Sequence, residues 1–177
     1  VRPVMHMDVP EEEYVKIRNR DLTLEDMRML QRTVPMVRQV TPLFFMATEL
    51  KANGRSTSVN LIMTNDTYVE LNGLDLAAGR NFVASDLRLG SKVVIVGSKI
   101  AERLGLKGNL PGKIVQTPTM SLEIIGVLEE QGATMGHDPD INIYIPLSTG
   151  LPLLTDQQRR QLMFQARVDP KLNADDG

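Results

Sequence analysis

Two long stretches of extended character dominate the first half of the chain. Residues 36–52 form a long apolar-rich run, and residues 55–64 alternate apolar and polar side chains, as a half-buried strand does. Asn53-Gly54 lies between the two runs, and this dipeptide favours a type I′ turn, whose two central residues both need positive φ. The pattern therefore predicts a β-hairpin that turns at Asn53-Gly54.

The remaining pattern predicts several short helices and strands. A first helix is expected over residues 23–34, because Thr23 and Asp26 have the spacing of a capping box and Pro35 ends the apolar helical repeat. Further short helices are expected at residues 67–71, after Ser85-Asp86, and at 99–104 and 147–155. Strands are expected at residues 1–7, 92–96, 113–116, 122–128, 141–145 and 161–168. This mixture predicts an α+β fold, with a polar, mobile loop at residues 129–140.

Composition and charge exclude several classes of function. The 177 residues are 42% apolar and 24% charged, which is enough for one domain or two small ones. The net charge of −2 speaks against a nucleic-acid-binding domain. The absence of cysteine excludes a disulfide, a thiolate zinc site, an iron–sulfur cluster and a cysteine nucleophile. No apolar run approaches the roughly 20 residues of a membrane-spanning helix, and no signal peptide opens the chain.

The candidate catalytic and metal-binding motifs are either incomplete or better explained by structural roles. The loop from Gly108 to Gly112 has three residues between its glycines and Ile114 after its lysine, whereas a phosphate-binding loop needs four residues and a Ser or Thr. Met5-His6-Met7 is better explained by thioether packing than by copper binding, and the acidic stretch 137–142 by a solvated turn than by a hard cation. We therefore expect no catalytic residue, no metal and no cofactor, and a domain that is not an enzyme.

Six segments, taken in order, resemble one protein family. They are Leu22-Thr23-Leu24-Glu25-Asp26; Gly73-Leu74 with Gly79-Arg80-Asn81-Phe82 and Ser85-Asp86; residues 93–104; Leu110-Pro111-Gly112-Lys113-Ile114; residues 122–128; and residues 144–149. Their order resembles the MacB-like periplasmic core domain of ABC transporter permeases, which is related to the LolC/LolE and FtsX groups. The chain departs from the family pattern at Leu110, where an acidic residue is usual, and its tail resembles a truncated form of the domain.

The resemblance implies a fold and a place in the cell. It implies a porter-like α/β subdomain at residues 1–78 and 148–177, interrupted by a small β-rich subdomain at residues 79–147. It also implies the extracytoplasmic part of a bacterial inner-membrane permease, with membrane helices outside these residues. Such a domain would act by mechanotransmission, passing ATP-driven motion of the membrane helices to a periplasmic partner or cargo in efflux or lipoprotein release.

The partners that the resemblance implies are an ABC ATPase subunit or domain, a second permease copy, and a periplasmic adaptor, lipoprotein or other periplasmic protein. Mobile loops and an apolar edge suit such contacts. In a one-sided sheet, part of the contiguous apolar run Leu43-Phe44-Phe45-Met46 would face outward and form such an edge. Packing of this run in the core is the more frequent outcome. The candidate contact residues are Leu43, Phe44, Phe45, Lys107, Asn109, Leu110, Glu129, Glu130, His137 and Asp138.

Two other functions stay open at this level. A stand-alone extracytoplasmic module would bind a lipid, a lipoprotein or a peptide saturably. A hydrolase would depend on His6 or His137, the two histidines of the chain.

Overall fold

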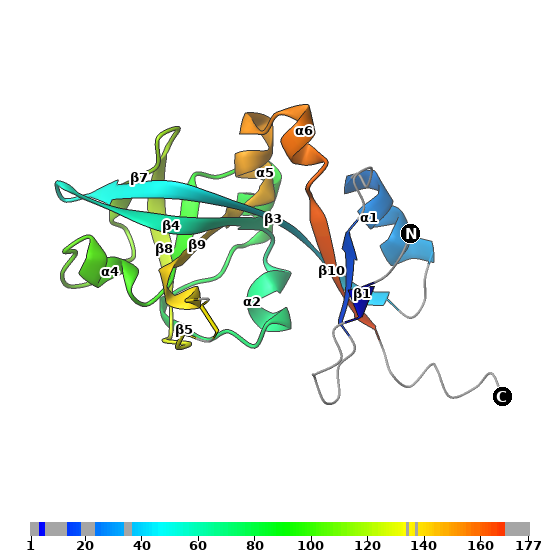
Figure 1. The fold of residues 1–177 in the computed structure, drawn as a ribbon, viewed down its shortest axis with the longest axis horizontal. Coiled ribbons are helices and arrows are strands. Elements are labelled where there is room, and N and C mark those ends of the chain that lie inside the picture. The colour runs from blue at the N-terminus through cyan, green and yellow to red at the C-terminus, as the bar shows by residue number, and fades with distance from the viewer. Residues whose placement is uncertain are drawn as a thin grey trace. The chain divides into compact units, whose positions relative to one another are not determined.

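The computed structural model describes residues 4–5, 14–18, 24–33, 37–133, 135–136 and 138–168 (Figure 1). The chain divides into two compact units. Unit 1 comprises Val1–Phe44 and Leu153–Gly177, and unit 2 comprises Phe45–Pro152. Each unit is built from strands and short helices, which confirms the predicted α+β class.

Unit 1 contains one antiparallel set of strands. β1 (Val4–Met5) pairs with β2 (Tyr14–Arg18), β2 with β10 (Met163–Val168), and β10 with the first part of β3 (Val37–Ala52). Helix α1 (Leu24–Thr33) confirms the first predicted helix to within one residue, and α6 (Asp156–Arg159) precedes β10. The strand β2 was not predicted from the sequence, and the predicted strand at residues 161–168 corresponds to β10.

Unit 2 begins with the predicted hairpin. The rest of β3 continues to Ala52 and β4 (Arg55–Thr64) returns. Asn53 has a φ of 53° and Gly54 a φ of 71°, so both central residues lie in the left-handed region that a type I′ turn needs. Asparagine tolerates this region better than most residues that carry a Cβ, and glycine adopts it freely. The hairpin prediction is therefore confirmed together with its turn.

The strands of unit 2 form a closed circuit. In addition to the hairpin, it contains β6 (Val93–Val96), β7 (Ile114–Gln116), β8 (Ser121–Leu128) and β9 (Asn142–Pro146). The order β3-β4-β9-β6-β8 is completed by β7, which pairs with β8 and, through Lys51 and Gln116, with β3. The pairs β4·β9 and β6·β8 are parallel. All residues of β6 and β9 are buried, so these two strands form the centre of the core.

Short helices pack around this circuit. They are α2 (Thr67–Leu71), α3 (Ala84–Leu89), α4 (Ile100–Arg103), the 3-10 helix η1 (Pro139–Ile141) and α5 (Leu147–Gly150); a second 3-10 helix, η2 (Leu151–Leu153), crosses the division between the units. Helix α5 packs on β4 and β9, where Gly150 leaves room for the thioether of Met63. Helix α3 packs on α5, and the hydroxyl of Thr149 donates a hydrogen bond to the Ser91 carbonyl (2.6 Å).

Two features of unit 2 were not predicted from the sequence: a strand that ends at Gly79 and the complete burial of β9. No strand was expected at residues 76–79, but β5 (Leu76–Gly79) pairs with β8, where Gly79 lies opposite Gly126. The strand expected at residues 141–145 corresponds to β9, which is buried along its whole length and pairs with β4 on one side and β6 on the other.

The subdomain division at residues 79–147 stays a prediction. Unit 2 contains that whole segment together with the hairpin, and β9 from within it pairs with β4 from outside it. Among the residues that the structure describes, no helix has the length and apolar character needed to cross a membrane.

We expect two glycine substitutions to separate steric overlap from backbone strain. Gly79 (φ 76°) and Gly54 (φ 71°) share the left-handed region, but a Cβ at Gly79 would overlap the carbonyl oxygen of Ile125, whereas Gly54 faces open space. Gly54→Ala should lower the free energy of unfolding by about 1–2 kcal/mol, and Gly79→Ala by about 2–5 kcal/mol. Urea denaturation of the two variants measures the difference, and equal losses would contradict the arrangement of β5 against β8.

Candidate partner-contact site

The apolar run that the sequence offered as a contact edge splits between core and surface. Leu43 and Phe44 are each 2% exposed, as the core interpretation expects, and they are not accessible to a partner. Phe45, the next residue along β3, is 44% exposed and faces a shallow hollow together with Met46. Phe45 is therefore the residue of this group that a partner could contact.

The loop after α4 also mixes exposed and buried positions. Lys107 and Asn109 are exposed, whereas Leu110 is only 9% exposed and packs inward. The backbone of this loop is tied to β8, because the N–H of Gly112 donates to the carbonyl of Ile124 (2.7 Å). Lys107 and Asn109 are therefore accessible to a partner, whereas Leu110 contributes to packing.

The third predicted group lies at the ends of the loop between β8 and β9. Glu129 and Glu130 are exposed, and Asp138 is half-buried. His137 lies outside the described residues. Asp138 forms an ion pair with Lys99, at 2.9 Å between Nζ and Oδ2, which sequence reasoning did not connect. The pair links this loop to the start of α4.

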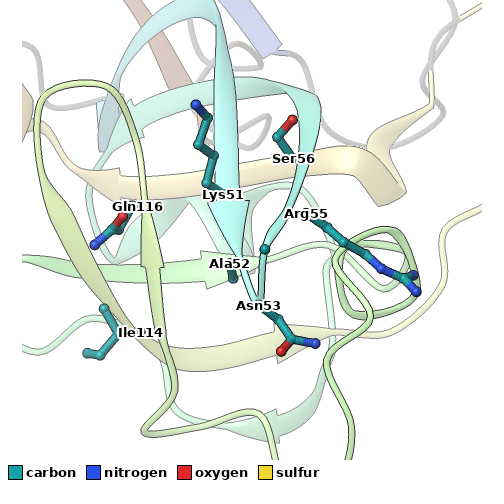
Figure 2. A pocket seen from close by; sticks show the side chains of 8 residues that line it. Lys51, Ala52, Asn53, Arg55, Ser56, Ile114 and Gln116 are labelled. Carbon is teal, nitrogen blue, oxygen red and sulfur yellow. The ribbon is translucent and has the colours of Figure 1, made fainter.

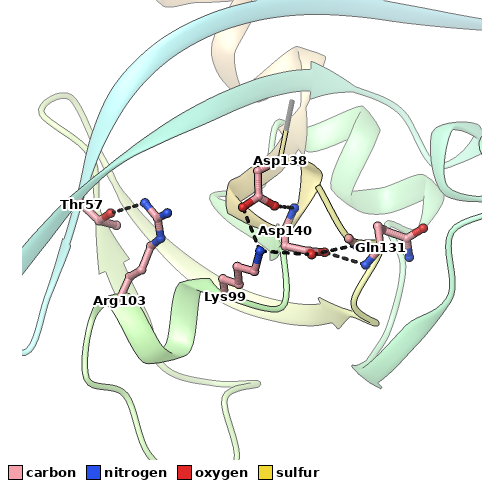
Figure 3. Close-up of polar contacts among 7 residues, drawn as sticks. Thr57, Lys99, Arg103, Gln131, Asp138 and Asp140 are labelled. Carbon is pink, nitrogen blue, oxygen red and sulfur yellow. Dashed lines mark hydrogen bonds and ion pairs between the residues drawn. The ribbon is translucent and has the colours of Figure 1, made fainter. Parts of the chain in front are cut away.

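A polar cluster around Asp140 fixes that loop (Figure 3). Asp140 is 1% exposed; its Oδ1 accepts the N–H of Gln131 (2.7 Å), and its Oδ2 accepts the N–H of Gly132 (3.0 Å). The Nζ of Lys99 lies 3.8 Å from the same Oδ2, and the N–H of Asp140 donates to the Asp138 carboxylate (3.1 Å). The solvated turn expected for residues 137–142 is thus wrong for Asp140, whose carboxylate is buried and bound to backbone.

The charges of the cluster support one another. The hydrogen bond from Lys99 holds the pKa of Asp138 below its usual value of 3.8, and the N–H of Asp140 acts in the same direction. The same bond to Asp138 raises the pKa of Lys99, to which Asp140 and Glu130 add through their negative charge. Both side chains are therefore charged through the neutral pH range. Their ion pair is solvated, so its main effect is to orient the loop.

A second set of contacts joins α4 to the hairpin. The amide of Asn53 donates to the carbonyl of Gly105 (3.1 Å), and Arg103 Nη1 donates to the hydroxyl of Thr57 (3.4 Å), as Figure 3 shows for Arg103. Gly105 has positive φ, and a Cβ there would come within 3.0 Å of the Arg55 guanidinium. Sequence reasoning missed these residues. One sequence signal could have indicated this contact: Lys99 and Arg103 are four residues apart, which places them on one face of a helix.

An open hollow of about 560 Å³ lies at the turn of the hairpin (Figure 2). It is lined by Lys51, Ala52, Asn53, Gly54, Arg55, Ser56, Ile114 and Gln116. Figure 2 shows that Lys51 and Arg55 point in different directions. The cations therefore do not converge on one point, as they would in a site for a small anion.

Unit 2 contains a further ion pair at the start of α3. This pair, Arg80 and Asp86 (2.8 Å), stabilises the start of α3: burial would raise the pKa of Asp86, but the hydrogen bonds from Arg80 and from the N–H of Val83 lower it below its usual value. Within the part of the chain that the structure describes, no group of three His, Asp or Glu side chains could hold a metal ion.

Comparison with known proteins identifies the family. Residues 4–175 match the MacB-like periplasmic core domain. The chain belongs to this family. The resemblance seen in the sequence motifs is therefore confirmed, and the chain is a periplasmic core domain of the kind found in MacB-like ABC transporter permeases.

Individual members of the MacB-like family align at moderate identity. The macrolide export ATP-binding/permease protein MacB of Rhodopseudomonas palustris is 27% identical over 130 residues, which are 72% of this chain and 20% of that protein. The uncharacterized ABC transporter permease YknZ of Bacillus subtilis is 32% identical over 84 residues, 48% of this chain and 21% of that protein. The chain thus spans about a fifth of the length of these relatives.

Two solved structures share the fold of this MacB-like domain. The periplasmic region of MacB from Actinobacillus actinomycetemcomitans has a TM-score of 0.73 at 25% identity, over 89% of this chain and 69% of that one. The extracellular domain of the ABC-type transporter YknZ from Gram-positive bacteria has a TM-score of 0.69 at 25% identity, over 84% of this chain and 73% of that one.

We expect Asp140→Asn to loosen the loop between β8 and β9. An amide has one acceptor oxygen, so one of the two N–H groups at Gln131 and Gly132 loses its partner, at a cost of about 1–3 kcal/mol. Amide hydrogen exchange at these two positions should become faster. The matched control is Asp75→Asn, which removes a charge at an exposed position of the same unit. Unchanged exchange at Gln131 and Gly132 would contradict the role given to Asp140.

We also expect Lys99 to set the titration of Asp138. In the wild-type chain the carboxyl should titrate below pH 3.8, so its contribution to stability is present above pH 3.8 and is lost as pH falls through the lowered pKa. In Lys99→Gln the midpoint should rise toward 3.8, without reaching it fully because the N–H of Asp140 still donates. Carboxyl carbon NMR measures the midpoint, and Arg88→Gln, on the exposed face of α3, should leave it unchanged.

Proposed function

We propose that this chain is the extracytoplasmic domain of an ABC transporter permease and passes ATP-driven motion of the membrane helices to a periplasmic partner or cargo. The observation that carries the proposal is the family match over residues 4–175. The relatives named as ATP-binding/permease proteins support it, since the chain covers only part of their length. ATP hydrolysis would then belong to a separate ATPase subunit or domain, and a second permease copy would complete the transporter.

The order of the strands along the chain supports this proposal. The first and last described strands, β1 and β10, both belong to unit 1, so membrane segments before and after this chain would connect to the same unit. Unit 2 is entered and left through unit 1, at Phe44–Phe45 and at Pro152–Leu153. Motion of the flanking helices would therefore act first on unit 1, and unit 2 would carry the surfaces that a partner contacts.

The contact residues remain part of the proposal. The exposed members of the predicted set in unit 2 are Phe45, Lys107, Asn109, Glu129 and Glu130. These side chains are exposed to solvent, so a partner can reach them.

The test uses the complete permease with its ATPase, reconstituted in lipid. The chain has no cysteine, so Thr119→Cys, at an exposed position of unit 2, offers one specific spin-label site in each copy of this domain. Trapping the ATP-bound state should shift the label-to-label distance between two copies, as electron paramagnetic resonance measures it.

The control is an ATPase variant that cannot bind nucleotide, in which the distance should stay fixed. A distance that is the same in the apo and ATP-trapped states would contradict transmission of motion. If the isolated chain then bound a lipid or peptide saturably, the stand-alone binding module considered from the sequence would replace the proposal.

A further inference from the structure

The hairpin and α4 together carry three exposed basic residues. Arg55 begins β4, Arg103 ends α4, and Lys107 follows Gly105 by two residues; all three are exposed. We call these three residues the basic seam. Arg55 lies against Gly105, and Arg103 reaches Thr57, so the two arginines lie on either side of the junction between β4 and α4.

The basic seam has unused binding capacity. Among the described residues, no carboxylate lies within ion-pair distance of Arg55, Arg103 or Lys107, in contrast to Lys99, which is held by Asp138. A guanidinium has five N–H donors, and the contact of Arg103 with Thr57 uses one. The charges that oppose the seam are Glu102, which is exposed on α4, and Asp138, whose carboxylate interacts electrostatically with Arg103.

The surface is also held in place before any partner arrives. The bond from Asn53 to the Gly105 carbonyl ties the hairpin turn to the end of α4, and Arg103 to Thr57 adds a second tie. Lys99 and the Asp140 cluster fix the other end of α4. Pre-ordering reduces the conformational entropy lost on binding, so a modest number of charge contacts can give useful affinity.

We propose that the basic seam binds an acidic segment of a periplasmic protein partner, a step that rests on the proposed function and names the chemistry of that partner. The two arginines favour carboxylates, because their planar forks can pair with a carboxylate in two parallel hydrogen bonds. An anionic membrane surface fits less well: recognition of such surfaces uses clusters of four to eight basic residues, and Glu102 interrupts this one. Discrete carboxylates on a protein segment can avoid Glu102.

The test uses the 177-residue chain and a fluorescent twelve-residue peptide of alternating glutamate and glycine. A matched peptide carries glutamine in place of glutamate. Fluorescence anisotropy should show binding of the glutamate peptide, and binding should weaken about tenfold between 50 and 500 mM salt because exposed charge contacts are screened. Arg55→Glu and Arg103→Glu should each weaken it about three- to tenfold.

Arg88→Glu is the matched control, since it reverses an exposed arginine of the same unit on α3 and should leave binding unchanged. Equal binding of the two peptides, or equal loss in Arg88→Glu and Arg103→Glu, would overturn the proposal. Binding to phosphatidylglycerol vesicles that depends on Arg55 and Arg103, without preference for the glutamate peptide, would overturn it in favour of a membrane surface. Either failure leaves the ATP-dependent distance change of the proposed function intact, so the two proposals can fail separately.

Discussion

The parallel pairing of β4 with β9 is the interaction on which unit 2 depends. Five residues of β4, from Asn60 to Thr64, face the five residues of β9 in continuous register. Two parallel neighbours cannot be joined by a tight turn, so the chain between them must make a long crossover. Here the crossover contains β5, β6, β7 and β8, and β6 then pairs with the other edge of β9. This pairing therefore brings the two ends of the crossover side by side within unit 2.

Buried polar groups define the register of that pairing. Asn142 is 2% exposed. Its side-chain Oδ1 accepts from the side-chain amide of Asn60 on β4 (3.1 Å), and its side-chain Nδ2 donates to the hydroxyl of Tyr144 (3.4 Å). The ring of Tyr144 packs against that of Tyr68, with centroids 5.2 Å apart, and burial raises the pKa of both hydroxyls, which keeps them neutral. A shift of β9 by one residue would leave Asn142 without a partner in the core, at a cost that apolar neighbours cannot offset.

The sequence predicted what is encoded locally. The hairpin could be predicted because Asn53-Gly54 favours one turn type, and α1 because its cap and Pro35 lie within a dozen residues of each other. The parallel pairing and the closure by β7 could not, because both bring together segments far apart in the chain. For the same reason, the sequence predicted individual residues of the site but not the contacts between them. Lys99 and Asp138 are 39 residues apart, and Asn53 and Gly105 are 52 apart, so no motif contains either pair.

The structure distinguishes residues that hold the loops of the site in place from exposed residues that could determine which partner binds. Asp140 has both carboxylate oxygens on backbone N–H groups, and a Cβ at Gly97 would press against the backbone of Asp140, so neither position can change without moving the loop. Lys107 and Asn109 are exposed, and among the described residues neither side chain forms an ion pair. A permease domain that kept the first kind of residue and varied the second would retain its scaffold while meeting a different partner. The weak sequence identity to relatives with the same fold is what such a division would produce, because most of the exposed surface is free to change while a small buried framework is not.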